Sequence, residues 1–238
     1  MIQQFKRVLI KLSGEALIAS DGFWLDHAVL ARLAKDLADC VTAGFQLAVV
    51  IGAGNIIRGA KVAADGRIDR PTADSMGMLA TVINSLALES AIEAAGCEAV
   101  TMSAVAMPSL CETYARQPAL HHISKKRVLV LAGGTGNPFF TTDTAAVLRA
   151  AELGCEAVFK VTQVDGVYTA DPKKDPTATR FERLTHDEAI LRDLKVLDTA
   201  AFALARESKM PIIVGSAHAP SSIGGILRGE ALSTLVAP

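Results

Sequence analysis

The chain has 238 residues, of which half are hydrophobic, so it is long enough to bury one large core or two small ones. A formal net charge of −1 gives no electrostatic reason to expect a nucleic acid or a membrane surface as a partner. No apolar run approaches the roughly 20 residues of a membrane span, and the first residues do not form a signal peptide. The four cysteines form no CxxC pair. We therefore expect free thiols and a cytoplasmic protein.

The first part of the chain alternates short apolar runs with amphipathic stretches. Strands are predicted at 7–12, 45–51 and 97–102, because each is a short, almost wholly apolar run. Helices are predicted at 26–41 and 72–95 from their apolar periodicity. The polar segment 62–71 is predicted as a loop long enough to act as a flap, and 103–126 as a short helix with loops.

The central stretch 127–154 combines a strand, a glycine loop and a helix. Residues 128–132 predict a strand that is buried on both faces, and glycines follow at 133, 134 and 136. Thr141, Thr142 and Asp143 then precede an apolar helix, for which Gly154 is placed as the C-cap. A glycine loop at the positive end of a helix makes a natural anion site, although a glycine-rich turn of any α/β protein is the plainer interpretation of the loop alone.

The last part continues the alternation. We predict a strand at 156–161, a tight turn at 164–167 and a capping box at Thr185 that opens a helix to Leu194. A turn at 195–198, a helix at 199–209, a strand at 211–214, a loop at 221–225 and a short strand near Leu235 complete the chain. Strand–helix alternation throughout predicts an α/β fold, with a mostly parallel sheet covered on both faces. No linker divides residues 1–238, so we predict one domain, with two lobes around a cleft.

Four loops follow apolar strands, and the first carries a lysine. Lys11 lies near the end of the strand at 7–12, where a buried ammonium group is costly, so we expect it at the ligand-binding edge of the sheet. Solvent exposure of its tip is the alternative. The loops read KLSG (11–14), GAGNIIRG (52–59), GGTGNPFFTTD (133–143) and VDGVYTADP (164–172). Neither a Walker motif nor the GxGxxG spacing of dinucleotide-binding proteins is present, so a dehydrogenase is disfavoured.

Together, KLSGEAL, GNPFFTTD and VDGVYTADP make the sequence resemble the bacterial uridylate (UMP) kinases of the amino-acid kinase superfamily over nearly its whole length. The resemblance implies a three-layer α/β/α sandwich. It implies transfer of the γ-phosphoryl group of Mg-ATP to UMP, giving UDP and ADP, in de novo pyrimidine nucleotide (CTP) biosynthesis. Magnesium would arrive with ATP, and no protein metal site is expected. The UMP side would lie in residues 1 to about 150, and the ATP side in the remainder.

The resemblance also assigns roles to residues that match the family motifs. Catalytic roles fall on Lys11, Arg58, Asp143 and Asp198, although helix capping is an equally good explanation for Asp198. An arginine just after glycines suits a forked phosphate contact. The ATP-binding set is Lys11, Leu12, Ser13, Gly14, Gly54, Arg58, Thr162, Tyr168 and Asp171. The UMP-binding set is Ala53, Asp74, Thr135, Gly136, Asn137, Pro138, Phe139, Phe140, Thr141 and Thr142.

Two positions depart from the family pattern. Ala53 replaces a common glycine and narrows the backbone approach near UMP, and Trp24 lies in a segment associated with regulation by GTP. Some family members are hexamers that GTP activates and UTP inhibits. We expect a homohexamer, with the apolar 76–92 helix as its interface, but Glu89 and Glu93 are not the basic residues that would bind an activator's phosphates.

Two other functions remain open at this stage. One is a superfamily kinase for another small molecule, namely acetylglutamate, aspartate or carbamate, against which GNPFFTTD argues. The other is a non-catalytic nucleotide-binding or storage protein on the same fold, which the presence of Lys11 and Asp143 disfavours.

Overall fold

The computed structural model describes residues 5–194, 196–217 and 222–238, and it is built on one nine-stranded sheet. The strand order is β4-β3-β5-β2-β1-β6-β8-β9-β7, and every neighbouring pair is parallel except β8 and β9. The predicted mostly parallel sheet is therefore confirmed. The strands are β1 (Arg7–Leu12), β2 (Gln46–Ile51), β3 (Ala99–Ser103), β4 (Glu112–Thr113), β5 (Val128–Ala132), β6 (Ala157–Val161), β7 (Arg183–Thr185), β8 (Ile212–Gly215) and β9 (Ser233–Ala237).

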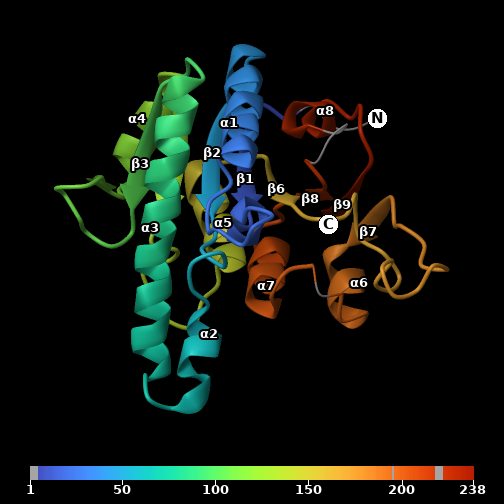
Figure 1. Ribbon diagram of the computed structural model, residues 1–238. Helices are drawn as coiled ribbons and strands as arrows, with labels where there is room; N and C mark the ends of the chain where they lie inside the picture. The colour runs from blue at the N-terminus through green and yellow to red at the C-terminus, as the bar shows by residue number, and fades with distance from the viewer. Residues whose placement is uncertain (1–4, 195, 218–221) are drawn as a thin grey trace.

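Helices cover both faces of the sheet and make the predicted three layers (Figure 1). Helices α1, α3 and α8 pack on one face, and α4, α5, α6 and α7 pack on the other. The helices are α1 (His27–Thr42), α2 (Gly59–Val62), α3 (Arg70–Ala94), α4 (Arg116–Ser124), α5 (Thr142–Leu153), α6 (His186–Leu191), α7 (Thr199–Glu207) and α8 (Ile223–Leu227). Short 3-10 turns lie at Gly14–Leu17 and Ala63–Asp65.

The central strands are apolar on both faces because both faces are buried. Val8 and Ile10 of β1 join the core under α1 and α3, whereas Leu9 between them joins the core under α5 and α7. All three side chains are fully buried. This is the pattern expected of a parallel strand between two helical layers.

The helix ends follow the predicted local signals. Asp26 caps α1 by accepting hydrogen bonds from the amides of Ala28 and Val29, and Thr185 forms the predicted capping box with Glu188. Gly154, with φ of 63°, ends α5 in the left-handed conformation that favours glycine.

Several boundaries differ from the predictions. The segment 62–71 is not one loop, since it holds the end of α2, a 3-10 turn and the start of α3, with Pro71 in the first turn, where a missing amide costs nothing. Helix α6 ends at Leu191, three residues early. The predicted loop at 221–225 overlaps α8, while Ser221 and Lys195 lie outside the described residues. The short strands β4 and β7 were not predicted, because two or three residues carry too little periodicity.

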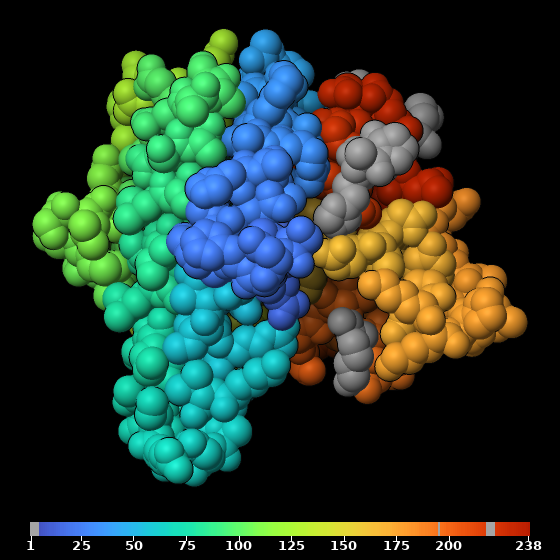
Figure 2. All heavy atoms as spheres, viewed as in Figure 1, coloured from blue at the N-terminus to red at the C-terminus, as the bar shows by residue number. Residues whose placement is uncertain are grey.

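Helix α3 is the longest element and projects beyond the sheet. Figure 1 shows it beside α1, with α2 against its first turns, and in Figure 2 the segment from α2 into α3 forms a lobe at the lower edge. Among the described residues, α3 alone is long and apolar enough to cross a membrane by length and composition. Buried core helices of soluble proteins pass the same test, and α3 contributes Leu88 and Ile92 to the core.

Candidate functional site

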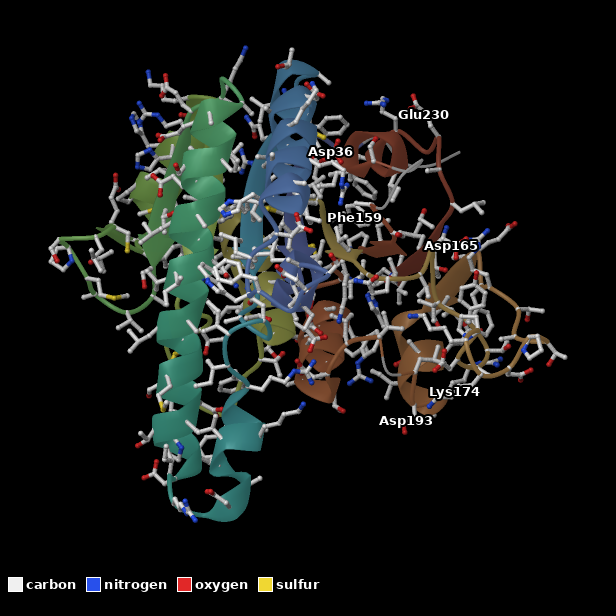
Figure 3. The ribbon with its side chains drawn as sticks, in the orientation of Figure 1. Asp36, Phe159, Asp165, Lys174, Asp193 and Glu230 are labelled. Atoms are coloured by element: carbon white, nitrogen blue, oxygen red, sulfur yellow. The ribbon has the colours of Figure 1, made fainter. Side chains whose placement is uncertain are left out.

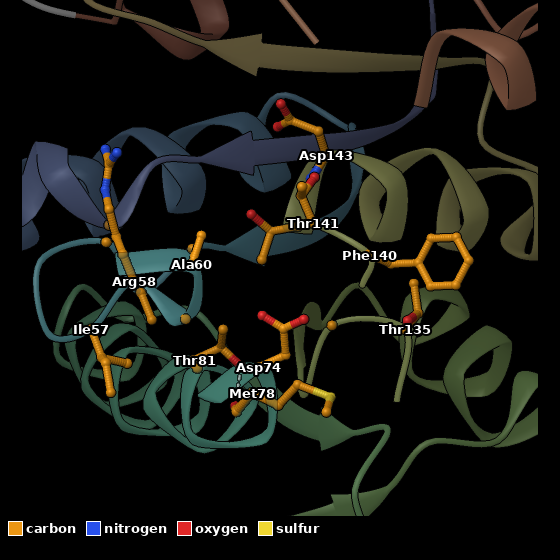
Figure 4. Close-up of a pocket in the computed structure, with 18 of the residues that line it drawn as sticks. Ile57, Arg58, Ala60, Asp74, Met78, Thr81, Thr135, Phe140, Thr141 and Asp143 are labelled. Atoms are coloured by element: carbon orange, nitrogen blue, oxygen red, sulfur yellow. Dashed lines mark hydrogen bonds between the residues drawn. The ribbon is translucent and has the colours of Figure 1, made fainter. Parts of the chain in front are cut away.

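A cavity of about 460 Å³ lies where β1, β2 and β5 end and α3 and α5 begin. Loops that follow neighbouring parallel strands meet at this edge of the sheet. Figure 4 shows Asp143 and Thr141 on one side of the space and Asp74, Met78 and Thr81 of α3 on the other. Of the predicted site residues, those that line the cavity are Lys11, Ser13, Gly14, Ala53, Gly54, Arg58, Asp74, Thr135, Asn137, Phe140, Thr141, Thr142, Asp143 and Asp198.

Two lysines share the carboxylate of Asp143, which lines this cavity together with Lys11. Strands β1 and β6 are parallel neighbours, and their register places Lys11 directly beside Lys160. The Lys11 ammonium lies 2.8 Å from Asp143 Oδ1, and the Lys160 ammonium donates to Asp143 Oδ2 and to the Val196 carbonyl. All three side chains are at most 14% exposed. The cluster therefore keeps a net positive charge in a largely desolvated place.

Burial and charge oppose each other within the cluster. Burial alone would raise the pKa of Asp143, but the two ammonium groups outweigh it and hold that pKa below its ordinary value. For Lys160, burial is the larger effect and lowers the pKa of the ammonium, and Asp143 offsets only part of the shift. Asp143 therefore stays ionised at neutral pH and anchors both cations.

The start of α5 adds a second source of positive potential. Thr141 caps the helix, because its hydroxyl accepts hydrogen bonds from the amides of Asp143, at 3.0 Å, and Thr144. The predicted oxygen-bearing first turn is thus confirmed. Glycine-rich backbone precedes the cap, and the unpaired amides of a helix N-terminus favour anions. An anionic ligand in the cavity would face both this helix end and Lys11.

Asp198 serves two elements at once. Its carboxylate caps α7 through the Ala201 amide at 2.8 Å, which confirms the capping interpretation. It also accepts hydrogen bonds from the hydroxyls of Thr141 and Thr144 on α5, and it lines the cavity. The carboxylate therefore ties α7 to the start of α5 at the edge of the site.

Two ion pairs stand at the mouth of the cavity. Arg58, which opens α2, pairs with Glu15 from the loop after β1, and both side chains are about half exposed. Asp74 accepts two hydrogen bonds from Arg70 Nε at 2.9 Å and one from the Phe139 amide at 2.8 Å. Asp74 thereby joins α3 to the loop 133–141. Phe139 there has a φ of 71°, which is uncommon for a bulky residue and marks a constrained loop.

The remaining predicted residues lie outside this cavity. Gly136, Pro138 and Phe139 belong to the loop that borders it without lining it, and Leu12 and Thr162 line a smaller space of about 60 Å³, which Ser13 also lines. Tyr168 and Asp171 lie between β6 and β7 and line neither space. Figure 3 shows Asp165 and Lys174 of this segment on the side of the molecule away from α3.

Three residues in and around the site were not predicted from the sequence, namely Lys160, Glu15 and Arg70. Lys160 lies in the strand AVFKV and offers the same signal as Lys11, namely a lysine near the end of an apolar strand. Lys160 could therefore have been predicted on the same ground as Lys11. Glu15 and Arg70 offer no such signal, because half-exposed charges at helix starts are ordinary.

The chain is similar to known proteins over nearly its whole length. Residues 6–216 match the model of the amino acid kinase family. A uridylate kinase from Azorhizobium caulinodans is 60% identical over 98% of both chains, and one from Agrobacterium fabrum is 55% identical over 98% of this chain and 96% of its own. The crystal structure of UMP kinase from Ureaplasma parvum aligns with 34% identity and a TM-score of 0.93, covering 99% of this chain and 100% of that one. The UMP kinase structure from Bacillus anthracis aligns with 35% identity and a TM-score of 0.94, covering 99% and 97%.

Proposed function

The chain belongs to the amino acid kinase family, and from this premise we propose that it transfers the γ-phosphoryl group of ATP to UMP, giving ADP and UDP. One observation carries the proposal, which is that Lys11 and Asp143 line a cavity formed by glycine loops, with Lys160 as the second lysine on the Asp143 carboxylate. The near full-length identity to uridylate kinases selects UMP as the acceptor. UDP would then supply the synthesis of pyrimidine nucleotides.

Phosphoryl transfer needs positioning and charge neutralisation rather than covalent chemistry from the protein. We assign Lys11 to the transferred phosphoryl group, where negative charge builds up as the reaction proceeds. Lys160 adds a second cation from the next strand, and Asp143 holds the two ammonium groups together. Because the groups are fixed before substrate arrives, little reorganisation is needed during the reaction.

The acceptor would lie on the α3 side of the cavity. We assign UMP to the loop 135–142, to Ala53 and to Asp74. Asp74 lies on α3 and already accepts a hydrogen bond from that loop. Asp74 has accepting oxygens suited to ribose hydroxyls. The Arg70 and Phe139 contacts of Asp74 would then hold the carboxylate in place for the sugar.

The donor would lie across the loops after β1 and β2. Backbone amides of Ser13, Gly14 and Gly54 are assigned to the ATP phosphates together with Arg58, which must exchange Glu15 for phosphate. That exchange costs little, because exposed ion pairs contribute at most about 1 kcal/mol. The base and ribose of ATP are assigned to Leu12, Thr162, Tyr168 and Asp171.

Magnesium would arrive on the nucleotide. The carboxylates that face the cavity are already engaged, Asp143 by lysines, Glu15 and Asp74 by arginines, and Asp198 by hydroxyls and an amide. Among the described residues, no group of three or more His, Cys, Asp or Glu side chains could hold a metal ion. These residues fit a cation carried by ATP phosphates, which would neutralise phosphate charge.

We also propose a homohexamer in the cytoplasm, with α3 as a subunit face. Leu79 and Ile83 of this helix are 49% and 48% exposed although they are large and apolar. Exposed apolar side chains on one helix are suited to packing against a second copy. Activation by GTP and inhibition by UTP belong to the same proposal. Glu89 on α3 is acidic, so it would not bind the phosphates of the activator.

The test is ADP release from Mg-ATP against UMP, CMP, dUMP, acetylglutamate, aspartate and carbamate. We expect turnover with UMP above all other acceptors, and GTP and UTP are then added to the UMP reaction. Turnover with an amino acid or carbamate instead would replace UMP as the acceptor. Binding of UMP without turnover on the whole panel would show a nucleotide-binding or storage protein.

A further inference from the structure

One fully buried polar side chain, Asn84 on α3, ends at a glycine loop of the site. The α3 positions one and two turns later on the same stripe are Leu88 and Ile92, so Asn84 occupies a core position that would suit an apolar residue. Asparagine is a weak helix former, and burying its amide is costly unless the amide is hydrogen-bonded. Helix stability and core packing therefore do not explain this residue.

The hydrogen bonds of Asn84 all lead to the loop after β2. Its Nδ2 donates to the Gly52 carbonyl and to Asn55 Oδ1, both at 2.8 Å. Asn55 Nδ2 donates back to Asn84 Oδ1 at 3.1 Å and also to the Trp24 carbonyl at 2.8 Å. The reciprocal amide pair thus joins three segments, namely α3, the loop 52–55 and the segment before α1.

Gly52 is the point at which three loops of the site meet. A Cβ on Gly52 would lie 3.3 Å from Thr142 Oγ1 and 3.4 Å from the Gly14 amide nitrogen. A Cβ on Gly14 would lie 2.4 Å from the Gly52 carbonyl oxygen, which is the atom that Asn84 holds. Because the contacts are this close, a shift of Gly52 would displace the loops after β1 and β5 as well.

Asn84 does not line the cavity and is fully buried, so substrate does not reach it. We propose that Asn84 is a positioning residue for phosphoryl transfer, which fixes the glycine loop after β2 through Gly52 and Asn55. This inference rests on the proposed kinase function. Its effect would fall on turnover, because a displacement of about 1 Å between reacting groups can cost on the order of 100-fold in rate.

The test compares three variants of the full chain. Asn84→Leu has a similar volume and removes the amide, and Asn55→Ala removes the reciprocal pair from the loop side but leaves the Gly52 bond. Ser85→Ala is the matched control, because this buried hydroxyl donates only to the Thr81 carbonyl within α3. Steady-state kinetics, UMP binding by calorimetry and hydrogen exchange of the 52–58 amides are measured for each.

We expect Asn84→Leu to lower kcat by roughly 10- to 100-fold and Asn55→Ala by about threefold to tenfold, with UMP affinity within about threefold. Exchange at 52–58 should rise in both variants and stay unchanged in Ser85→Ala. If Asn84→Leu does not fold, Asn55→Ala decides the question alone.

Unchanged kcat in a folded variant would overturn the positioning role, and so would a fall in kcat without faster exchange at 52–58. A parent chain that does not phosphorylate UMP would overturn the kinase proposal and, with it, this inference. Failure of the inference alone is recognised by an active parent with unaffected variants.

Discussion

The two sides of the proposed site are built very differently. On the side of Lys11 and Asp143, adjacent parallel strands place Lys11 and Lys160 against a carboxylate of α5, and all three side chains are at most 14% exposed. On the side of Tyr168 and Asp171, the bonds are local, from the Tyr168 hydroxyl to Asp165 at 2.6 Å and from the Lys173 amide to Asp171 at 3.0 Å. The contacts of the first side join segments far apart in the chain, whereas those of the second side lie within one segment.

The ligands that we propose for the two sides explain this difference. Cations stabilise the charge of a phosphoryl group during transfer best when they are fixed in a site that excludes water. Reorganisation of the cations during the reaction would reduce this stabilisation. An adenine and a ribose carry no such demand, and a surface segment that adapts on binding is sufficient.

Asp143→Asn should damage the buried side most severely. The change leaves two lysines without their carboxylate, and breaking a buried ion pair typically costs about 3–5 kcal/mol of unfolding free energy. Urea unfolding at pH 7 measures the loss, with Asp171→Asn on the exposed side as the control. Equal stability of the two variants would show that the lysine cluster contributes no more to the fold than the surface loop.

The difference in unfolding free energy between the parent chain and Asp143→Asn should depend on pH. The pKa of Asp143 is lower in the folded chain than in the unfolded one, where it is about 3.9. Its stabilising contribution is therefore complete above about pH 4 and is lost as the pH falls through the folded pKa. The gap in unfolding free energy between the parent chain and Asp143→Asn should narrow as the pH falls below about 4, and a constant gap would contradict the lowered pKa.

Lys11→Ala should reduce turnover far more than UMP binding. A lysine that acts on the transferred phosphoryl group works mainly in the transition state, so we expect kcat to fall by roughly 100- to 1000-fold while the Kd of UMP changes little. The control is Lys35→Ala, which removes an exposed lysine of α1 paired only with Asp39 within its own helix. Unchanged turnover in Lys11→Ala would remove this residue from the catalytic set.

Much of the side with Lys11 and Asp143 could be predicted from the sequence, although the contacts among its residues could not. Local sequence signals predict the structure at Lys11, at the glycines 133, 134 and 136 and at the helix cap Thr141. Strand alternation then brings these residues to one edge of a parallel sheet. Lys160 carried the same local signal as Lys11, but only the register of β1 and β6 shows that the two lysines share a carboxylate.

Other features depend on partners distant in the chain. In the sequence, Asn84 looks like an ordinary residue of a helix, because its hydrogen-bond partner Gly52 lies 32 positions away. The two-residue strand β4 exists because β3 provides an edge for it, and not because Glu112 and Thr113 favour extended backbone. Tertiary contacts, rather than local propensity, decide both.

Thr144→Val tests the junction between α5 and α7. The change keeps the shape of the side chain but removes the hydrogen bond to Asp198 at 3.0 Å, in a residue that is 6% exposed. Hydrogen bonds to charged groups are typically worth about 1.5–3 kcal/mol, so unfolding free energy should fall by less than in Asp143→Asn. Thr144→Ser, which keeps the hydroxyl, should recover most of the loss. Equal losses in both variants would point to packing of the methyl group instead.

Tyr168→Phe should have the smallest effect and should be confined to ATP. The hydrogen bond to Asp165 is the main reason that the pKa of the Tyr168 hydroxyl is raised, and this partly exposed pair adds little to stability. We expect the KM for ATP to rise by at most about fivefold, with kcat and the KM for UMP unchanged, because one net hydrogen bond is worth about 1 kcal/mol. A fall in kcat would mean that the segment between β6 and β7 closes over the cavity and takes part in aligning the phosphates. If the segment is instead an adaptable nucleotide-binding surface, kcat stays unchanged, because the loss of one contact there weakens ATP binding without disturbing the lysine pair.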